Sequence, residues 1–138
     1  MTPDAAEVAR VLWEGDRASQ GLGMTIDEIG EGRAQLSMTV REDMTNGHDI
    51  CHGGFLFALA DSAFAFACNS ANLVAVASSA HIEFVAPANI GERLTATATQ
   101  VWTGGRAGLT DVDVTGPDGR LVARFHGRSS RTGGTIIS

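Results

Sequence analysis

Residues 53–68 read GGFLFALADSAFAFAC, and this stretch decides the fold of the 138-residue chain. Its apolar side chains fall on every side of a helix, and its length of about 16 residues exceeds that of a typical strand. A helix that is apolar all round must be covered on all sides. The sequence therefore predicts one central helix that other parts of the protein surround.

The residues before this stretch predict a short helix and a hairpin. Thr2 as the N-cap and Pro3 at the first helical position predict a helix that continues to about Glu14. Residues 24–41 predict two strands joined by a turn at 30–32, because glycines mark the turn and apolar residues alternate along the second arm.

Four further strands are predicted after the central helix. They span residues 73–85, 94–102, 107–115 and 121–129. Tight glycine turns join the last three, which makes those strands antiparallel neighbours. One antiparallel sheet wrapped around one helix satisfies this order of elements, so we predict an α+β fold with a single domain over residues 1–138.

Composition and charge narrow the classes of function. The net charge is −6 and no basic run occurs, which disfavours nucleic acid as a partner. The longest apolar stretch is too short for a membrane span and contains Asp61. No signal-peptide layout precedes it, and two cysteines do not make a disulfide framework. We expect a cytoplasmic protein with neither nucleic acid nor membrane as a partner.

Asp61 is the most informative residue of the chain. It lies in the middle of the apolar helix, where Ser62 is the only other polar side chain between Gly53 and Cys68. An ionised carboxylate is costly to desolvate, and such costly acids concentrate at functional sites. A buried salt bridge is the structural alternative. We interpret Asp61 as the essential carboxylate of an active site.

His52, Gly53 and Gly54 mark the start of the same helix. Glycines at a helix N-terminus leave backbone N–H groups approachable at the positive end of the helix dipole. An oxyanion hole needs such fixed donors, although a plain glycine hinge has the same sequence. Gly53 and Asp61 are eight positions apart, about 12 Å along a helix, so one helix cannot bring both to one carbonyl group. We therefore expect the site to form between two copies of the chain, and a second copy also covers the outer side of the helix.

The loop before the helix offers other chemistry. His48, Cys51 and His52 match no strong metal-ligand spacing, so we expect no metal. Cys51 beside His52 lacks a third group to orient a nucleophile pair. Asn46 before Gly47 fits an ordinary turn or a residue that orients substrate or water, and the pattern leaves both open.

Some residues are candidates for contact with the substrate. Phe55, Phe64 and Phe66 cannot be divided into core and pocket positions from the sequence. Three arginines near the C-terminus form either a solvated face or a phosphate-binding site: Arg124, Arg128 and Arg131. The candidates that we take forward are Gly54, Phe64, Arg128 and Arg131.

The helix and the loop before it also resemble a known family. The residues Asn46-Gly47-His48, Cys51-His52-Gly53-Gly54, Leu59-Ala60-Asp61-Ser62-Ala63-Phe64-Ala65 and Ala67-Cys68-Asn69-Ser70 resemble the PaaI-type acyl-CoA thioesterases of the hotdog-fold superfamily. The resemblance covers about residues 46–70, and the order of elements agrees along nearly the whole chain.

The resemblance implies a fold, a reaction and residue roles. The fold is a curved antiparallel β-sheet wrapped around one long α-helix, in dimers that pair into tetramers. The reaction is hydrolysis of coenzyme A thioesters, including phenylacetyl-CoA and its ring-hydroxylated relatives, in phenylacetate degradation. The family's catalytic acid falls on Asp61, its donor to the thioester carbonyl on Gly53 close to His52, and its asparagine on Asn46.

We therefore expect an acyl-CoA thioesterase that needs no metal or redox cofactor, since coenzyme A is part of the substrate. Asp61 either attacks the thioester carbon or activates a water, and the sequence leaves both open. Asn46 or His52 orients water or substrate. One alternative is a hydratase or dehydratase on the same fold, which would leave the thioester intact. The other is a non-catalytic acyl-CoA binding protein, which has no need of Asp61.

Overall fold

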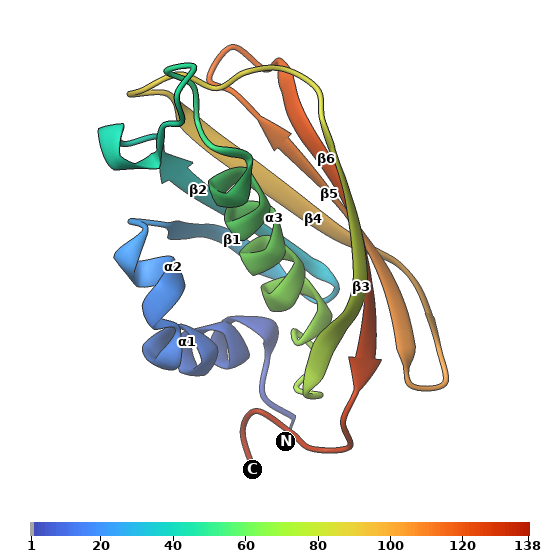
Figure 1. Cartoon of the computed structure of the whole chain (residues 1–138). Coiled ribbons are helices and arrows are strands. Elements are labelled where there is room, and N and C mark those ends of the chain that lie inside the picture. The colour runs from blue at the N-terminus through green and yellow to red at the C-terminus, as the bar shows by residue number, and fades with distance from the viewer. Residues whose placement is uncertain (1) are drawn as a thin grey trace.

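The computed structural model describes residues 2–138 and contains one six-stranded antiparallel sheet curved around a long helix (Figure 1). The helices are α1 (Ala5–Gly15), α2 (Arg17–Gly21) and α3 (Gly53–Cys68), with a 3-10 turn η1 (Glu42–Met44). The strands are β1 (Thr25–Gly30), β2 (Arg33–Thr39), β3 (Ala75–Phe84), β4 (Arg93–Gly104), β5 (Ala107–Thr115) and β6 (Leu121–Arg131). Their order is β1-β2-β4-β5-β6-β3, so the predicted sheet around one central helix is confirmed.

Helix α3 has the bounds that its sequence predicts. His52 caps its first turn, and at the other end the Asn69 side chain donates to the carbonyl oxygen of Ala65 at 2.8 Å. One side of α3 packs on the sheet and forms the centre of the core. The buried residues of that helix are Leu56, Leu59, Ala60, Ala63, Phe64, Phe66, Ala67 and Cys68. They meet the inward side chains of β2, β4, β5 and β6, which are apolar or small.

The opposite side of α3 carries a stripe of residues that are not fully buried. Its small members and Asp61 recur every three or four positions, so they line one face. The stripe consists of Gly54, Phe57, Ala58, Asp61 and Ala65. The sequence predicts that a second copy covers this whole side. In the structure α1 and α2 cover part of it, and Figure 1 shows them on one flank of α3 with β3 on the other.

Two details of the N-terminal region differ from the sequence prediction. Asp4, not Thr2, is the N-cap of α1, because its carboxylate accepts the Glu7 N–H at 2.9 Å and the helix begins after Pro3. The short helix α2 was not predicted. Its N-cap is Asp16, which directly follows Gly15, the last residue of α1.

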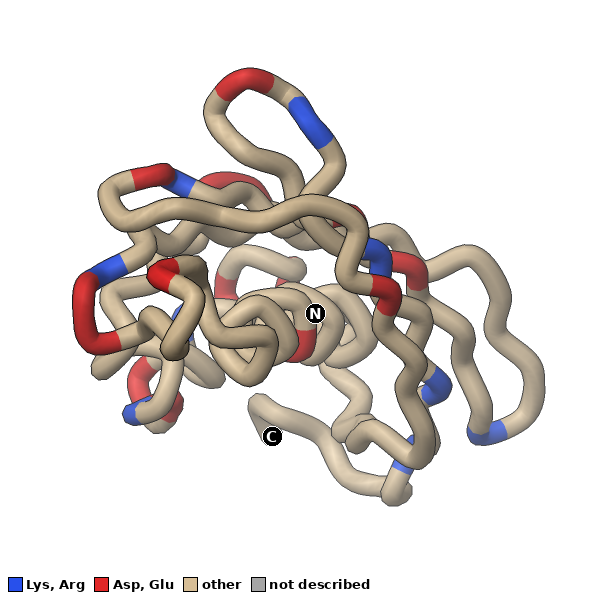
Figure 2. Tube along the Cα trace, turned by 45° about the horizontal axis from the view of Figure 1, so that its top comes forward, with Lys and Arg blue, Asp and Glu red and all other residues tan. Residues whose placement is uncertain are grey.

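The hairpin and the later strands follow the prediction with small shifts. The apolar buried positions of β2, Ala34, Leu36 and Met38, alternate as expected, and Ser37 on the other face is buried as well. Strand β3 is shorter than predicted, whereas β4 and β6 each extend two residues further. In the part of the chain that the structure describes, no helix is long and apolar enough to cross a membrane. Figure 2 shows charged residues of both signs interspersed around the periphery.

Strand β3 lies at the edge of the sheet and pairs with β6 alone. It runs antiparallel to α3: the Asn69 side chain at the end of the helix bonds the backbone of Ala75, and the ring of Phe84 lies over Gly53 at the helix start. The side chains of Val76 and Phe84 are more than half exposed, at 54% and 57%. A long edge strand with unpaired backbone groups and exposed apolar side chains can pair with a strand of another chain.

Candidate active site

The first turn of α3 leaves one backbone donor free. The Gly54 N–H donates to Nδ1 of His52 at 3.0 Å, and the Phe55 N–H donates to the His52 carbonyl at 3.0 Å. The Gly53 N–H has no acceptor among residues 2–138. It also lies at the positive end of the helix dipole, so it is placed to stabilise a developing negative charge.

A cavity of about 610 Å³ lies in front of this amide. Its wall is mostly apolar and comes from the loop before α3, the first turns of α3 and the segment after β3. The lining residues are Asn46, Ile50, Cys51, His52, Gly53, Leu56, Phe84, Val85, Ala86 and Pro87. A Cβ at Gly53 would lie 3.0 Å from Cζ of Phe84, so the ring covers the glycine and would have to shift to admit a side chain there.

The loop before α3 is held by its own hydrogen bonds. The Oδ1 atom of Asn46 accepts the His48 N–H at 2.9 Å, and the Asn46 N–H donates to the Ile50 carbonyl at 2.9 Å. The amide nitrogen of the Asn46 side chain bonds no group within residues 2–138, and this side chain lines the cavity. Asn46 therefore makes the turn, and its side-chain amide stays available beside the cavity; its role in orienting substrate or water remains a prediction.

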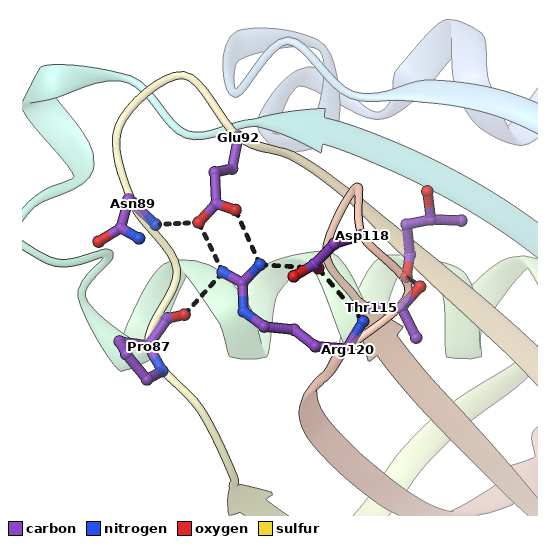
Figure 3. A network of polar contacts seen from close by, with 7 residues as sticks. Pro87, Asn89, Glu92, Thr115, Asp118 and Arg120 are labelled. Atoms are coloured by element: carbon purple, nitrogen blue, oxygen red, sulfur yellow. Dashed lines mark hydrogen bonds and ion pairs between the residues drawn. The ribbon is translucent and has the colours of Figure 1, made fainter.

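A polar network holds Pro87, one of the residues that line the cavity (Figure 3). The Arg120 guanidinium donates to Glu92 at 2.6 Å, to the Pro87 carbonyl at 2.9 Å and to Asp118 at 2.9 Å. The same Glu92 oxygen accepts the Asn89 N–H at 2.7 Å. The hydrogen bond from Arg120 is the main reason that the pKa of Glu92 lies below its ordinary value. The network joins the β5–β6 turn to the segment that lines the cavity.

Asp61 lies half-buried in the stripe of α3. No hydrogen bond or ion pair from residues 2–138 reaches its carboxylate, so the salt-bridge alternative has no partner within the described chain. Burial raises the pKa of Asp61, and the negative charge of Asp16 raises it further. An unpaired, partly desolvated carboxylate is a strong base for its type, as a proton-accepting or nucleophilic group requires.

The free amide and the carboxylate do not meet within one chain. Gly53 and Asp61 are separated by two turns of α3, about 12 Å. The residues that line the cavity include Gly53 and exclude Asp61. The separation predicted from the sequence is therefore present in the structure.

The predicted substrate contacts have different surroundings. Gly54 is exposed, and its N–H is already bonded to His52. Phe64 is 1% exposed and packs on Phe125 in the core, away from the cavity. Phe66 is likewise buried, against Trp13.

The arginines lie along β6, and none of them lines the cavity. Arg124 pairs with Asp113 at 2.9 Å on the outer face of the sheet. Arg128 is exposed, and Arg131 ends the strand beside Ala75. Phe84 lies nine residues from Ala75, about 30 Å along β3, so Arg131 is far from the Gly53 amide of its own chain.

The cysteine next to His52 has the wrong properties for a nucleophile. Burial raises the pKa of Cys51 to about 11, so the thiol is neutral near pH 7. Its Sγ lies 3.6 Å from the His52 carbonyl oxygen rather than facing the imidazole. Within residues 2–138, no group of three or more His, Cys, Asp or Glu side chains is arranged to hold a metal ion.

Sequence reasoning missed two parts of the site. The segment from Phe84 to Pro87 lines the cavity, but it is 31 positions from Gly53 along the chain and only the β3–β6 register brings it there. Asp16 was missed because α2 was not predicted. The aspartate before a polar Arg-Ala-Ser segment is a recognisable N-cap signal for that helix.

Comparison with known proteins identifies the family of the chain. Residues 48–123 match the model of the thioesterase superfamily. The acyl-coenzyme A thioesterase PaaI of Escherichia coli K12 is 45% identical over 136 residues, which cover 99% of this chain and 97% of that enzyme. The solved structure of the E. coli PaaI protein from the phenylacetic acid degradation operon superposes with a TM-score of 0.94, at 45% identity and 95% coverage of both chains.

A more distant relative is a hypothetical thioesterase of Streptococcus pneumoniae TIGR4, solved with coenzyme A. It is 25% identical, with a TM-score of 0.78 over 81% of this chain and 90% of the other. The chain therefore belongs to the thioesterase superfamily, and within it to the PaaI-type acyl-CoA thioesterases of the hotdog fold.

Proposed function

We propose that this thioesterase hydrolyses arylacetyl-coenzyme A thioesters, such as phenylacetyl-CoA and its ring-hydroxylated relatives, at a site shared by two copies of the chain. Gly53 of one copy supplies the oxyanion donor and Asp61 of the other supplies the carboxylate. The observation that carries this proposal is an unpaired, half-buried carboxylate about 12 Å from the free amide of its own helix.

The free edge of β3 supports a two-fold dimer. Because α3 and β3 run antiparallel, joining two β3 edges antiparallel would set the two α3 helices antiparallel, with the Gly53 end of one copy facing the α3 of the other, which carries Asp61. The join would also cover the exposed stripe around Asp61. The same operation brings the Arg131 end of one strand toward the Phe84 end of the other, where the phosphates of coenzyme A need a cation. We further propose that such dimers pair into tetramers.

The reaction follows from these positions. The thioester carbonyl oxygen accepts the Gly53 N–H, which stabilises the negative charge on that oxygen when the carbon is attacked. Asp61 either attacks the carbon and forms an anhydride that water then hydrolyses, or removes a proton from an attacking water. The carbon–sulfur bond breaks, and the sulfur leaves as the coenzyme A thiolate. The free side-chain amide of Asn46 and the exposed imidazole of His52 are placed to orient the substrate or the water.

The cavity favours an apolar acyl group of moderate size. Its volume of about 610 Å³ and its wall of Leu56, Phe84, Val85 and Pro87 suit a phenyl ring. An aromatic ring gains from edge or offset contact with the Phe84 ring. The E. coli relative comes from a phenylacetic acid degradation operon, which supports the same choice. The two free, buried cysteines accord with a reducing, cytoplasmic location.

A thiol-release assay tests the reaction and its acyl preference. We expect phenylacetyl-CoA to be hydrolysed with a higher kcat/KM than straight-chain acyl-CoA, and Asp61→Asn to lose at least about a hundredfold in kcat. Equal activity in the variant would remove Asp61 from the mechanism. Binding without thiol release would support a non-catalytic acyl-CoA binding protein, and altered acyl chains with intact thioester would support a hydratase.

A complementation experiment tests the shared site. Asp61→Asn and Gly53→Ala each damage both sites of a homodimer, but a mixed dimer keeps one site with both natural residues. Unfolding and refolding an equal mixture should therefore restore about one quarter of wild-type activity, since half of the dimers are mixed and each has one intact site. No recovery from an equal mixture whose mixed dimers are verified by mass spectrometry would place both residues in the same copy.

A further inference from the structure

The short helix α2 is connected to α3 next to Asp61 by a chain of hydrogen bonds. Asp16 accepts the Ser19 N–H at 3.0 Å with one carboxylate oxygen and the Ser19 hydroxyl at 2.7 Å with the other. The Ser19 Oγ lies 2.8 Å from the Ser62 Oγ. Because the Ser19 proton goes to Asp16, Ser62 is the donor in the second bond. Ser19 is 1% exposed, so water does not compete for these bonds.

We propose that Asp16 is a positioning residue for Asp61: it holds the α3 turn that carries Asp61 against α2 and keeps a second negative charge beside the catalytic carboxylate. This inference rests on the proposed role of Asp61. It gives the N-terminal helices, which lie outside the residues 48–123 matched by the superfamily model, a part in the reaction.

On α1 and α2, Arg10 and Glu14 pair with each other at 2.8 Å and Arg17 is exposed, so Asp16 is the charged group of these described helices that acts on Asp61. On α3 itself, Cys68 lies seven positions later on the same face, and burial raises the pKa of its thiol to about 11, so it is neutral near pH 7. The inward positions of β2, β4, β5 and β6 carry no titratable side chain within the described residues. On β3, His81 and Glu83 bond each other at 2.7 Å and alternate with Ile82 and Phe84, which lie on the α3 side of the strand, so they face outward.

Strand β1 adds no charge on this side, because Asp27 and Glu28 are both exposed and Asp27 bonds Thr25 and Ser37. Among residues 2–138, no cation offsets the effect of the negative charge of Asp16 on Asp61. A like charge favours the protonated form, so Asp61 is a better proton acceptor with Asp16 present.

The test compares three variants by the pH profile of kcat/KM for phenylacetyl-CoA. Asp16→Asn removes the charge but keeps an N-cap, since its amide oxygen can accept the Ser19 N–H and its amide nitrogen can donate to the Ser19 hydroxyl. Ser19→Ala breaks the chain to Ser62 and keeps the charge. Asp4→Asn makes the same chemical change at the N-cap of α1 and serves as the matched control.

We expect the acid limb of the profile to move to lower pH in Asp16→Asn and to stay in place in Asp4→Asn. At a pH on that limb, kcat/KM divided by its plateau value should be roughly two- to threefold higher in Asp16→Asn than in the wild type. Ser19→Ala should lower kcat without moving the limb. An acid limb that Asp16→Asn leaves in place, or that Asp4→Asn shifts equally, would overturn the proposal.

A titration of carboxyl-labelled aspartate by NMR gives a readout that does not depend on turnover, with Asp61→Asn to assign the signal. If Asp61→Asn keeps full activity, the proposed function fails. If Asp61→Asn is inactive but the Asp61 signal titrates identically with and without Asp16, only this inference fails.

Discussion

Replacing Gly53 by alanine tests the oxyanion donor without removing it. The backbone N–H remains, but the new Cβ would lie 3.0 Å and 3.1 Å from two ring atoms of Phe84. Phe84 is 57% exposed, so the ring can move by the few tenths of an ångström required, and the cost in stability should stay below about 1 kcal/mol. The displaced ring and the added methyl group crowd the space in front of the amide. We expect kcat to fall about a hundredfold, as when one oxyanion donor is lost.

Gly54→Ala is the matched control for this change. Its Cβ would meet only the exposed His52 ring, at 3.3 Å, and its N–H already has an acceptor. Thiol release from phenylacetyl-CoA should therefore fall less than about tenfold, while thermal melting of both variants stays close to wild type. The reasoning is refuted if Gly53→Ala keeps activity within about threefold of wild type, or if Gly54→Ala loses as much.

Three further changes have expected outcomes in thermal unfolding. Gly127→Ala puts a Cβ 2.5 Å from the buried Phe64 ring and should destabilise by about 1–3 kcal/mol, roughly 3–12 °C in Tm, whereas Gly47→Ala, with nothing within 4 Å, should change little. Asp61→Asn should raise Tm at pH 7. Burial raises the pKa of Asp61, so the folded state is destabilised at any pH above the pKa of an unburied aspartate, where the carboxylate is ionised, and asparagine removes that charge. An unchanged Tm would contradict this. Arg120→Gln should lower Tm at pH 7, because Arg120 lowers the pKa of Glu92 and thereby stabilises the folded state. The difference in Tm between variant and wild type should shrink as the pH falls below about 4.5, since this stabilisation disappears when Glu92 is protonated.

The fold was predictable where one local signal was strong. Apolar residues on every side of residues 53–68 fixed the central helix, and glycine turns fixed the β1–β2, β4–β5 and β5–β6 neighbours. The position of β3 at the edge beside β6 depends on long-range pairing, which no local pattern encodes. The start of α1 was misplaced because Thr2 and Asp4 both fit an N-cap, and only the bond to Glu7 decides between them.

The site was predictable to the extent that it depends on one helix. Helical spacing alone separated Gly53 from Asp61, and the structure has the same separation. The cavity wall from Phe84 to Pro87 and the charge of Asp16 depend on segments that meet only after folding. Phe64 was predicted to contact substrate but is buried in the core. The sequence near Asp61 looks the same whether an aromatic side chain faces a ligand or the core.

The residues proposed to do the chemistry and the residues proposed to surround the acyl group belong to different segments. The proposed catalytic groups lie on α3, whereas much of the cavity wall is the segment from Phe84 to Pro87, where Arg120 donates to the Pro87 carbonyl. Natural variation or laboratory evolution could therefore reshape acyl preference by changing that short wall while the hydrolytic groups stay intact. A library limited to this segment would be the most economical route to thioesterases for new acyl chains.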